Sequence, residues 1–79
     1  MEVGVIKHYF TNIGVAIVEL SAPIKVGDTI QIKGITSDFT QVVRSMQVAQ
    51  EVVKEASAGN SIGLKIMGHA REGDKVLIE

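Results

Sequence analysis

Two histidines and five serines are the side chains of this sequence with the most direct uses in catalysis or metal binding. His8 and His69 lie far apart in the chain, and catalytic zinc as a rule takes three protein ligands, so the pair is a weak metal signal. No serine has a histidine near it in sequence, so a Ser–His–Asp triad would depend entirely on chain folding. We expect His8 to point inward from a strand, hydrogen-bonded in the core or at its rim. No catalytic residue and no metal site is therefore expected.

Other reactive groups are missing from the sequence. There is no cysteine, which excludes disulfides, thiolate nucleophiles and cysteine-bound metals. Neither the phosphate-binding pattern Gly-x-x-x-x-Gly-Lys-Ser/Thr nor the dinucleotide-binding pattern Gly-x-Gly-x-x-Gly occurs. The sequence thus predicts a non-enzymatic protein that binds no nucleotide and uses no cofactor.

Basic and aromatic side chains raise the prospect of nucleic-acid binding. Lysine and arginine contact phosphates, and aromatic rings stack on bases. The net charge of −1 shows no basic excess, so RNA binding requires a local patch. The other interpretation is that these lysines keep a β-surface soluble and protect strand edges. The candidate RNA-binding residues are Lys7, Tyr9, Lys33, Arg44 and Lys65.

Glycines punctuate the chain and indicate short strands joined by turns. Eight glycines occur in 79 residues, most of them about ten residues apart. Alternating apolar residues predict strands at 3–10 and 13–20, with a hairpin turn at 11–12. The first strand then has two alternating sets of side chains on opposite faces: Ile6, His8 and Phe10 against Val5, Lys7 and Tyr9.

Both faces of this predicted hairpin are apolar. One face lines the core, and the other presents Val5, Val15 and Ile17, which need a different cover. A neighbouring strand or loop is one explanation, since scattered apolar side chains are normal on protein surfaces. The alternative is that these three residues bind a partner, which makes them candidate partner-binding residues.

The rest of the chain contains further strands and one ambiguous segment. Apolar alternation predicts strands at 29–33, 61–67 and 75–79. The segment 38–56, between the first and second of these strands, is rich in valine, which favours strand. Yet several apolar residues there recur at helical spacing, which alone predicts a helix over about 42–57: Val42, Met46, Ala49, Val53 and Ala56.

Several motifs follow one another along the chain, and the most specific are the turn Val26-Gly27-Asp28 and the segment 55–63, Glu-Ala-Ser-Ala-Gly-Asn-Ser-Ile-Gly. In this order they resemble domain II of translational GTPases such as elongation factor Tu and initiation factor 2. The match extends over nearly the whole chain. The resemblance implies an all-β fold, a small closed six- to seven-stranded Greek-key-like barrel of the translation-factor domain II type.

A closer resemblance is to stand-alone elongation-factor-like proteins. It rests on segments 7–10, Lys-His-Tyr-Phe, and 36–41, Thr-Ser-Asp-Phe-Thr-Gln. A similar module occurs at the C-terminus of some members of a collagenase-like peptidase family, several of which act in RNA modification. The resemblance implies strands near 41–48 and 52–56, in place of the helix that local spacing predicts.

The chain also departs from the translation factors. It has no GTPase domain, so the resemblance implies no GTP switching. Elongation factor Tu holds the aminoacyl end of tRNA partly with charged side chains, and these are missing at the matched positions of segment 47–51. The resemblance therefore does not imply aminoacyl-tRNA binding.

These observations lead to one expectation and one alternative. We expect residues 1–79 to form one domain II-like barrel, a non-enzymatic translation-associated module that contacts RNA, either tRNA or the ribosome. The alternative is a protein–protein accessory module for a separately encoded RNA-modifying or peptidase-like enzyme. We expect a cytoplasmic protein without a membrane segment, because the longest apolar run, 15–18, is far shorter than the roughly 20 residues a membrane helix needs.

Overall fold

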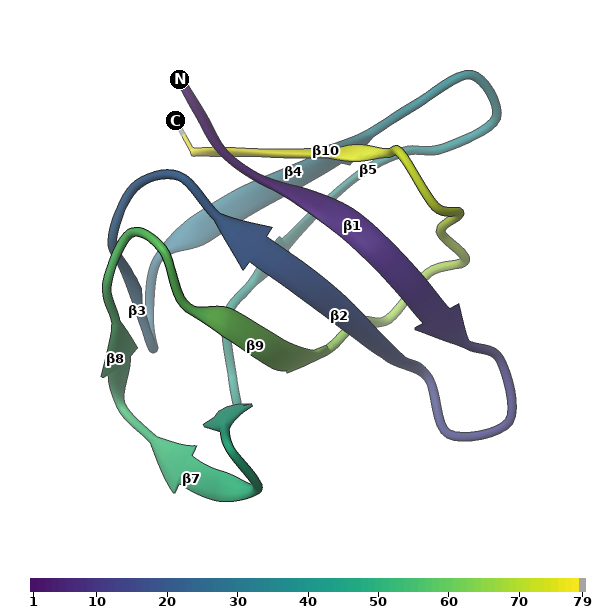
Figure 1. Cartoon of the computed structure of the whole chain (residues 1–79). Coiled ribbons are helices and arrows are strands. Elements are labelled where there is room, and N and C mark those ends of the chain that lie inside the picture. The colour runs from purple at the N-terminus through teal and green to yellow at the C-terminus, as the bar shows by residue number, and fades with distance from the viewer. Residues whose placement is uncertain (79) are drawn as a thin grey trace.

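The computed structural model describes residues 1–78, which form ten short β-strands. The strands are β1 (Glu2–Phe10), β2 (Val15–Leu20), β3 (Ile24–Lys25), β4 (Thr29–Lys33), β5 (Asp38–Val42), β6 (Met46–Val48), β7 (Glu51–Val53), β8 (Glu55–Ala56), β9 (Ser61–Lys65) and β10 (Lys75–Ile78). Eight of them form one sheet in the order β5-β4-β10-β1-β2-β9-β6-β7, and β3 pairs with β8. The large sheet curls strongly around the core (Figure 1).

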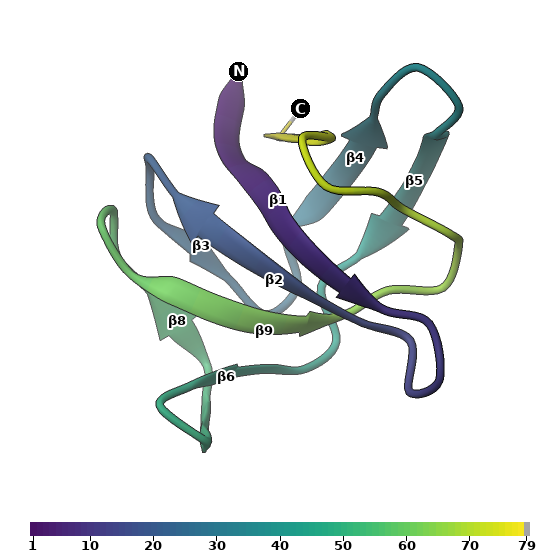
Figure 2. The same ribbon diagram turned by 45° about the vertical axis from the view of Figure 1, so that its right-hand side comes forward.

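The predicted all-β, barrel-like class is confirmed. Figure 2 shows β1 and β2 crossing the front of the molecule, with the β4–β5 hairpin on one side and β8 and β9 on the other. Turns divide the chain into ten strands instead of six or seven, and the shortest have only two or three residues. The closed Greek-key type stays a prediction. The last predicted strand is observed as far as Ile78, and Glu79 lies outside the described residues.

The core lies inside the curled sheet and consists of aliphatic side chains and Met46. Alternate residues of each strand point inward, as Ala16, Val18 and Leu20 do in β2. Ile62 and Leu64 of β9 are inward too and are at most 1% exposed. Burying such side chains is the main favourable term in folding, at about 25 cal/mol for each Å² of apolar surface.

A β-bulge in β1 corrects the predicted faces of this strand. Ile6 pairs with Val18, but His8 pairs with Ile17, so Lys7 is an extra residue. Beyond the bulge, the alternation shifts by one residue. Tyr9 consequently packs against the core, whereas His8 and Phe10 are exposed. The inward position predicted for His8 is therefore wrong.

The first hairpin turn is longer than predicted. Its four residues, 11–14, end at Gly14, which has a φ of 66°. The amides of Ile13 and Gly14 both donate to the carbonyl of Phe10, at 3.3 and 2.9 Å. Glycine adopts this left-handed conformation without steric cost, so β2 starts at Val15 and not at Ile13.

The ambiguous middle segment forms strands and no helix, as the family resemblance implied, but the strand expected near 41–48 is interrupted at 43–45 and the one near 52–56 is divided between β7 and β8. The helical spacing is incidental, because Val42 is 43% exposed while Gln41 and Val43 beside it are buried. A two-residue turn joins β6 to β7, and both of its residues have positive φ, 52° at Ala49 and 68° at Gln50. Nowhere in residues 1–78 is there a helix with the length and apolar character to cross a membrane.

Candidate functional site

A shallow apolar groove runs over the outer face of β2 and β9. It has a volume of about 480 Å³ and lies between the first hairpin and the β6–β7 hairpin. Phe10 and Ile13 stand at one end, 43% and 56% exposed. We call this the apolar groove; its lining residues are Phe10, Ile13, Val15, Ile17, Gln47, Ala49, Gln50, Ser61, Ile62 and Gly63.

Three local features of the sequence produce this groove. The bulge at Lys7 turns Phe10 outward, and the turn ending at Gly14 leaves Ile13 exposed. Gly63 pairs with Ile17 on the neighbouring strand. Because glycine has no side chain, nothing from that position covers Ile17, and a Cβ there would already approach Val15 to 3.6 Å.

The groove has the chemistry of a binding surface. Its walls are apolar or carry neutral amides and a hydroxyl, and none of its lining residues is charged. The groove therefore has no charged acid or base that could assist a reaction there. It can accept an apolar side chain from another molecule without the cost of stripping water from an ion.

The structure brings together two of the three candidate partner-binding residues. Val15 and Ile17 lie side by side in the groove, each half-buried. Val5 also points outward, but its cross-strand neighbours are Glu19 and Lys75, and it does not line the groove. Whether any of the three binds a partner stays a prediction.

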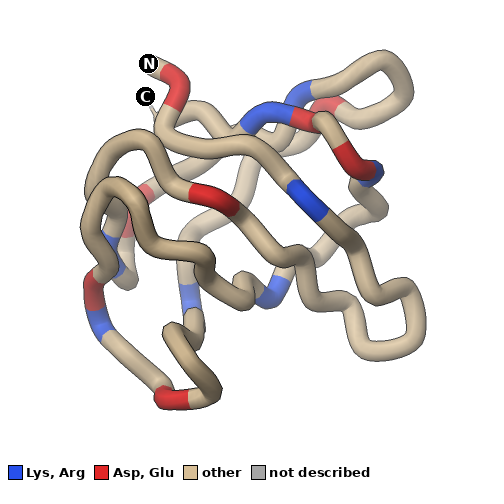
Figure 3. Tube along the Cα trace, viewed as in Figure 1, with Lys and Arg blue, Asp and Glu red and all other residues tan. Residues whose placement is uncertain are grey.

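The candidate RNA-binding lysines are dispersed, and two of them have partners within the chain. Lys7 forms an ion pair with Glu19 at 3.6 Å. The ammonium of Lys65 donates to the carbonyl of Ile13 at 2.5 Å. Figure 3 shows basic and acidic residues interspersed along the chain trace.

The remaining RNA candidates are Lys33, Arg44 and Tyr9. Lys33 ends β4 and Arg44 follows β5, and both are exposed. Tyr9 points inward, and its hydroxyl donates to the carbonyl of Gly68 at 3.3 Å. Its ring is thus committed to packing, with little surface left for stacking on a base. The RNA-binding role of all five residues stays a prediction.

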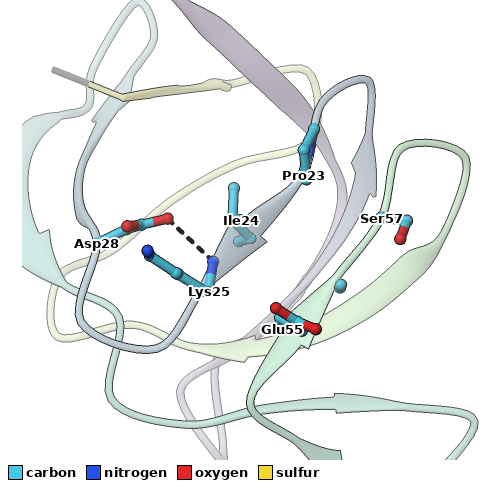
Figure 4. A pocket seen from close by; sticks show the side chains of 7 residues that line it. Pro23, Ile24, Lys25, Asp28, Glu55 and Ser57 are labelled. Carbon is cyan, nitrogen blue, oxygen red and sulfur yellow. Dashed lines mark hydrogen bonds between the residues drawn. The ribbon is translucent and has the colours of Figure 1, made fainter.

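A second hollow lies between β3 and β8 and contains polar groups. Figure 4 shows Lys25, Asp28 and Glu55 around it, with Ser57 set apart from Lys25 and Asp28. Asp28 accepts a hydrogen bond from the Lys25 amide at 3.0 Å, which fixes the turn between β3 and β4. Across residues 1–78, no three His, Cys, Asp or Glu side chains lie close enough to hold a metal ion.

Sequence analysis missed Phe10, Ile13 and the β6–β7 hairpin as parts of one surface. One signal was available, because a glycine inside a strand, such as Gly63, often marks a place where another group approaches closely. The bulge had no comparable signal, since Lys7 and His8 are ordinary strand-surface residues. Without the bulge, Phe10 is assigned to the core and the groove loses one end.

The fold closely matches two solved structures. They are the C-terminal domain of a putative U32 peptidase of Geobacillus thermoleovorans and its selenomethionine variant, with TM-scores of 0.93 and 0.92. The first match covers 99% of this chain and 91% of that chain, and the second covers 98% of both. Sequence identity is 18% in each, so the likeness establishes the fold alone.

A protein related in sequence also connects this chain with peptidases. An uncharacterised protease of Methanocaldococcus jannaschii is 37% identical over 79 residues. The match covers 99% of this chain and 19% of the relative, so the chain spans about a fifth of the length of the curated relative. No family model matches the chain. These findings support the peptidase side of the resemblance, while the likeness to domain II of translational GTPases stays a prediction.

Proposed function

We propose that this chain is a non-catalytic accessory module that binds a peptidase-like catalytic chain. The observation that supports this proposal is how much of each chain the sequence match to the protease relative covers. The chain aligns almost completely with one fifth of a protein named as a protease, and its fold is that of a C-terminal peptidase domain. The remaining four fifths of that relative has no counterpart in this chain, and a catalytic unit would lie there.

The apolar groove is the docking surface of this proposal. Its centre has half-buried aliphatic side chains, Val15 and Ile17, and Phe10 stands at its edge. Binding energy at protein interfaces concentrates in a few apolar and aromatic anchors that become fully shielded from water. An uncharged groove suits such an anchor from the catalytic chain, because no ion has to be desolvated.

The test is binding of the purified full chain to the peptidase-like chains of its own genome, produced separately and measured by calorimetry. Ile17→Lys places a charge in the groove and should weaken binding at least about tenfold. The matched control is Val42→Lys, because Val42 is exposed on β5 and does not line the groove. Equal binding by wild type and Ile17→Lys would remove the groove from consideration.

An RNA-contacting role is the second candidate, and the sequence resemblance to closed domain II barrels of translation factors is what favours it. Against it, the five candidate residues are spread over β1, β4, β9 and the segment after β5. Affinity capture of the tagged chain from its own cell extract, with and without ribonuclease, separates the two functions. Recovery of tRNA or ribosomal RNA that is lost on ribonuclease treatment would favour RNA. A stoichiometric peptidase-like protein that survives the treatment would favour the accessory module.

A further inference from the structure

A third hollow, of about 600 Å³, lies at a different edge of the molecule, between the β4–β5 hairpin and the turn before β10. We call it the cationic notch. The hairpin projects beyond the body of the sheet beside this turn (Figure 1). The residues that line the notch are Lys33, Gly34, Ile35, Thr36, Arg71, Glu72, Gly73, Asp74 and Lys75.

Two lysines of the notch stand directly opposite each other. Lys33 of β4 pairs in register with Lys75 of β10, and both are exposed. Like charges in such a cross-strand pair are destabilising. Lys75 forms an ion pair with Glu2, whose carboxylate lies 3.3 Å from the Lys75 ammonium, and this offsets the repulsion. Among residues 1–78, Lys33 forms no ion pair.

The carboxylate nearest to Lys33 along the sheet is directed elsewhere. Asp38 is the cross-strand neighbour of Lys33 on β5. Its carboxylate accepts a hydrogen bond from the side-chain amide of Gln31 at 2.7 Å. Within the part of the chain that the structure describes, neither Lys33 nor Arg71 has a carboxylate within 4.0 Å of its charged group. These two cations are available to an incoming anion.

The two acidic residues of the notch have other partners within residues 1–78 and form no ion pair with Lys33 or Arg71. Glu72 lies 3.1 Å from the ring of His8, outside the notch. Asp74 is 6% exposed at the floor, and its carboxylate accepts a hydrogen bond from the Arg71 amide at 3.0 Å. Asp74 therefore holds the turn that presents Arg71, and since Lys75 is paired with Glu2, Lys33 and Arg71 are the two cations of the lining that remain for a partner.

An aliphatic side chain stands beside these cations. Ile35 is fully exposed at the tip of the β4–β5 hairpin. The tip is held in place, because the Gly34 amide donates to the Ser37 carbonyl at 2.7 Å and the Ser37 hydroxyl donates to the His69 carbonyl at 3.3 Å. A held, exposed isoleucine next to two available cations matches a partner that has both carboxylates and an aliphatic group.

We propose that the cationic notch binds an acidic segment of a protein, with glutamate or aspartate on Lys33 and Arg71 and an aliphatic residue against Ile35. Charge complementarity selects the acidic partner. A protein segment fits better than RNA, because the lining contains no aromatic ring for a base to stack on. The notch is separate from the apolar groove, so this proposal does not depend on the proposed function.

The test uses the full chain and a fluorescein-labelled short peptide of alternating glutamate and leucine, followed by fluorescence anisotropy. The expected result is saturable binding that weakens with salt. Lys33→Glu and Arg71→Glu should each weaken it about tenfold, because a charged hydrogen bond is lost and repulsion added. Ile35→Ser should weaken it severalfold. Lys25→Glu, a change of an exposed lysine that lines a different hollow, is the matched control and should leave it unchanged.

Three results would overturn the proposal. The first is no binding of this peptide by wild type at up to about 1 mM. The second is equal weakening by Lys33→Glu and by the Lys25→Glu control, which would mean non-specific attraction. The third is tighter binding of a uridine oligonucleotide that is lost in the same variants, which would make the notch an RNA site. Ile17→Lys should bind the peptide like wild type, which separates this surface from the apolar groove.

Discussion

Gln41 bonds to Met67 across the gap between the edge of the sheet and the chain that follows β9. The side-chain oxygen of Gln41 accepts from the Met67 amide at 2.8 Å, and its side-chain nitrogen donates to the Lys65 carbonyl at 3.0 Å. Four strands, β4, β10, β1 and β2, separate β5 from β9 in the sheet order. Gln41 is 8% exposed, so one shielded carboxamide joins two distant parts of the curled sheet.

Replacing the Gln41 carboxamide should destabilise the protein by more than the loss of one hydrogen bond, because this group bonds to two backbone groups. Gln41→Ala leaves one backbone amide and one backbone carbonyl without their partner, and we expect a loss of about 2–3 kcal/mol in the free energy of unfolding. The measurement is urea denaturation, with a lower midpoint at an unchanged slope. Gln31→Ala is the control, because it loses a hydrogen bond between exposed groups and should cost under about 1 kcal/mol. Equal losses would mean that water replaces the Gln41 bonds.

Gly34 should not tolerate a side chain. A Cβ at this position would lie 1.9 Å from a carboxylate oxygen of Asp74, which is itself buried. Gly34→Ala should therefore cost about 1–3 kcal/mol, whereas Gly63→Ala, with its nearest contact at 3.6 Å, should cost less. Thermal unfolding of both variants measures the difference.

The double variant identifies the cause of the Gly34 effect. If the clash with Asp74 is responsible, Gly34→Ala should cost much less in an Asp74→Ala background, which gives a coupling energy in a double-mutant cycle. Additive effects of the two changes would contradict this explanation and locate the strain in the backbone of the β4–β5 hairpin.

Much of the fold could be predicted from the chain alone because its strands obey local rules. At 29–33 and 61–65, apolar and polar residues alternate because one face of each strand is more buried than the other. The middle segment could not be assigned in this way. Its buried residues, such as Val43 and Met46, are separated by a break between β5 and β6, so neither a period of two nor one of 3.6 describes it.

The candidate site was less predictable, for a reason that one residue illustrates. Lys7 adds one position to β1, and this changes the face of every residue after it. A bulge depends on the pairing of two strands and leaves no mark in the composition of either. The extra residue belongs to β1, so alternation along β2 is regular, and the outward positions of Val15 and Ile17 were predicted correctly.

Truncation of two adjacent aromatic residues should therefore lower stability by different amounts. Tyr9→Ser removes core packing and a hydrogen bond to Gly68, and we expect a loss of about 2–3 kcal/mol. Phe10→Ser removes a ring that is exposed at the groove edge and should cost under about 1 kcal/mol. Chemical denaturation followed by far-UV circular dichroism compares them. The reverse order would mean that regular alternation holds through β1 and that the bulge is absent in solution.

The β6–β7 turn should be improvable, because its sequence and its conformation disagree. Ala49 and Gln50 both have positive φ, and a two-residue hairpin turn of this kind strongly prefers Asn-Gly. The left-handed conformation costs roughly 1–2 kcal/mol for an ordinary residue. Gln50→Gly should therefore raise the free energy of unfolding by about 1 kcal/mol, and adding Ala49→Asn should increase the gain. Calorimetry should register each kcal/mol as a rise of roughly 4–8 °C in Tm for a chain of this size.

The control is Ala58→Gly, an exposed loop position without a positive φ, where glycine should give no gain. A gain of similar size at both sites would show that the gain does not come from relief of the positive φ and that the β6–β7 turn is unstrained.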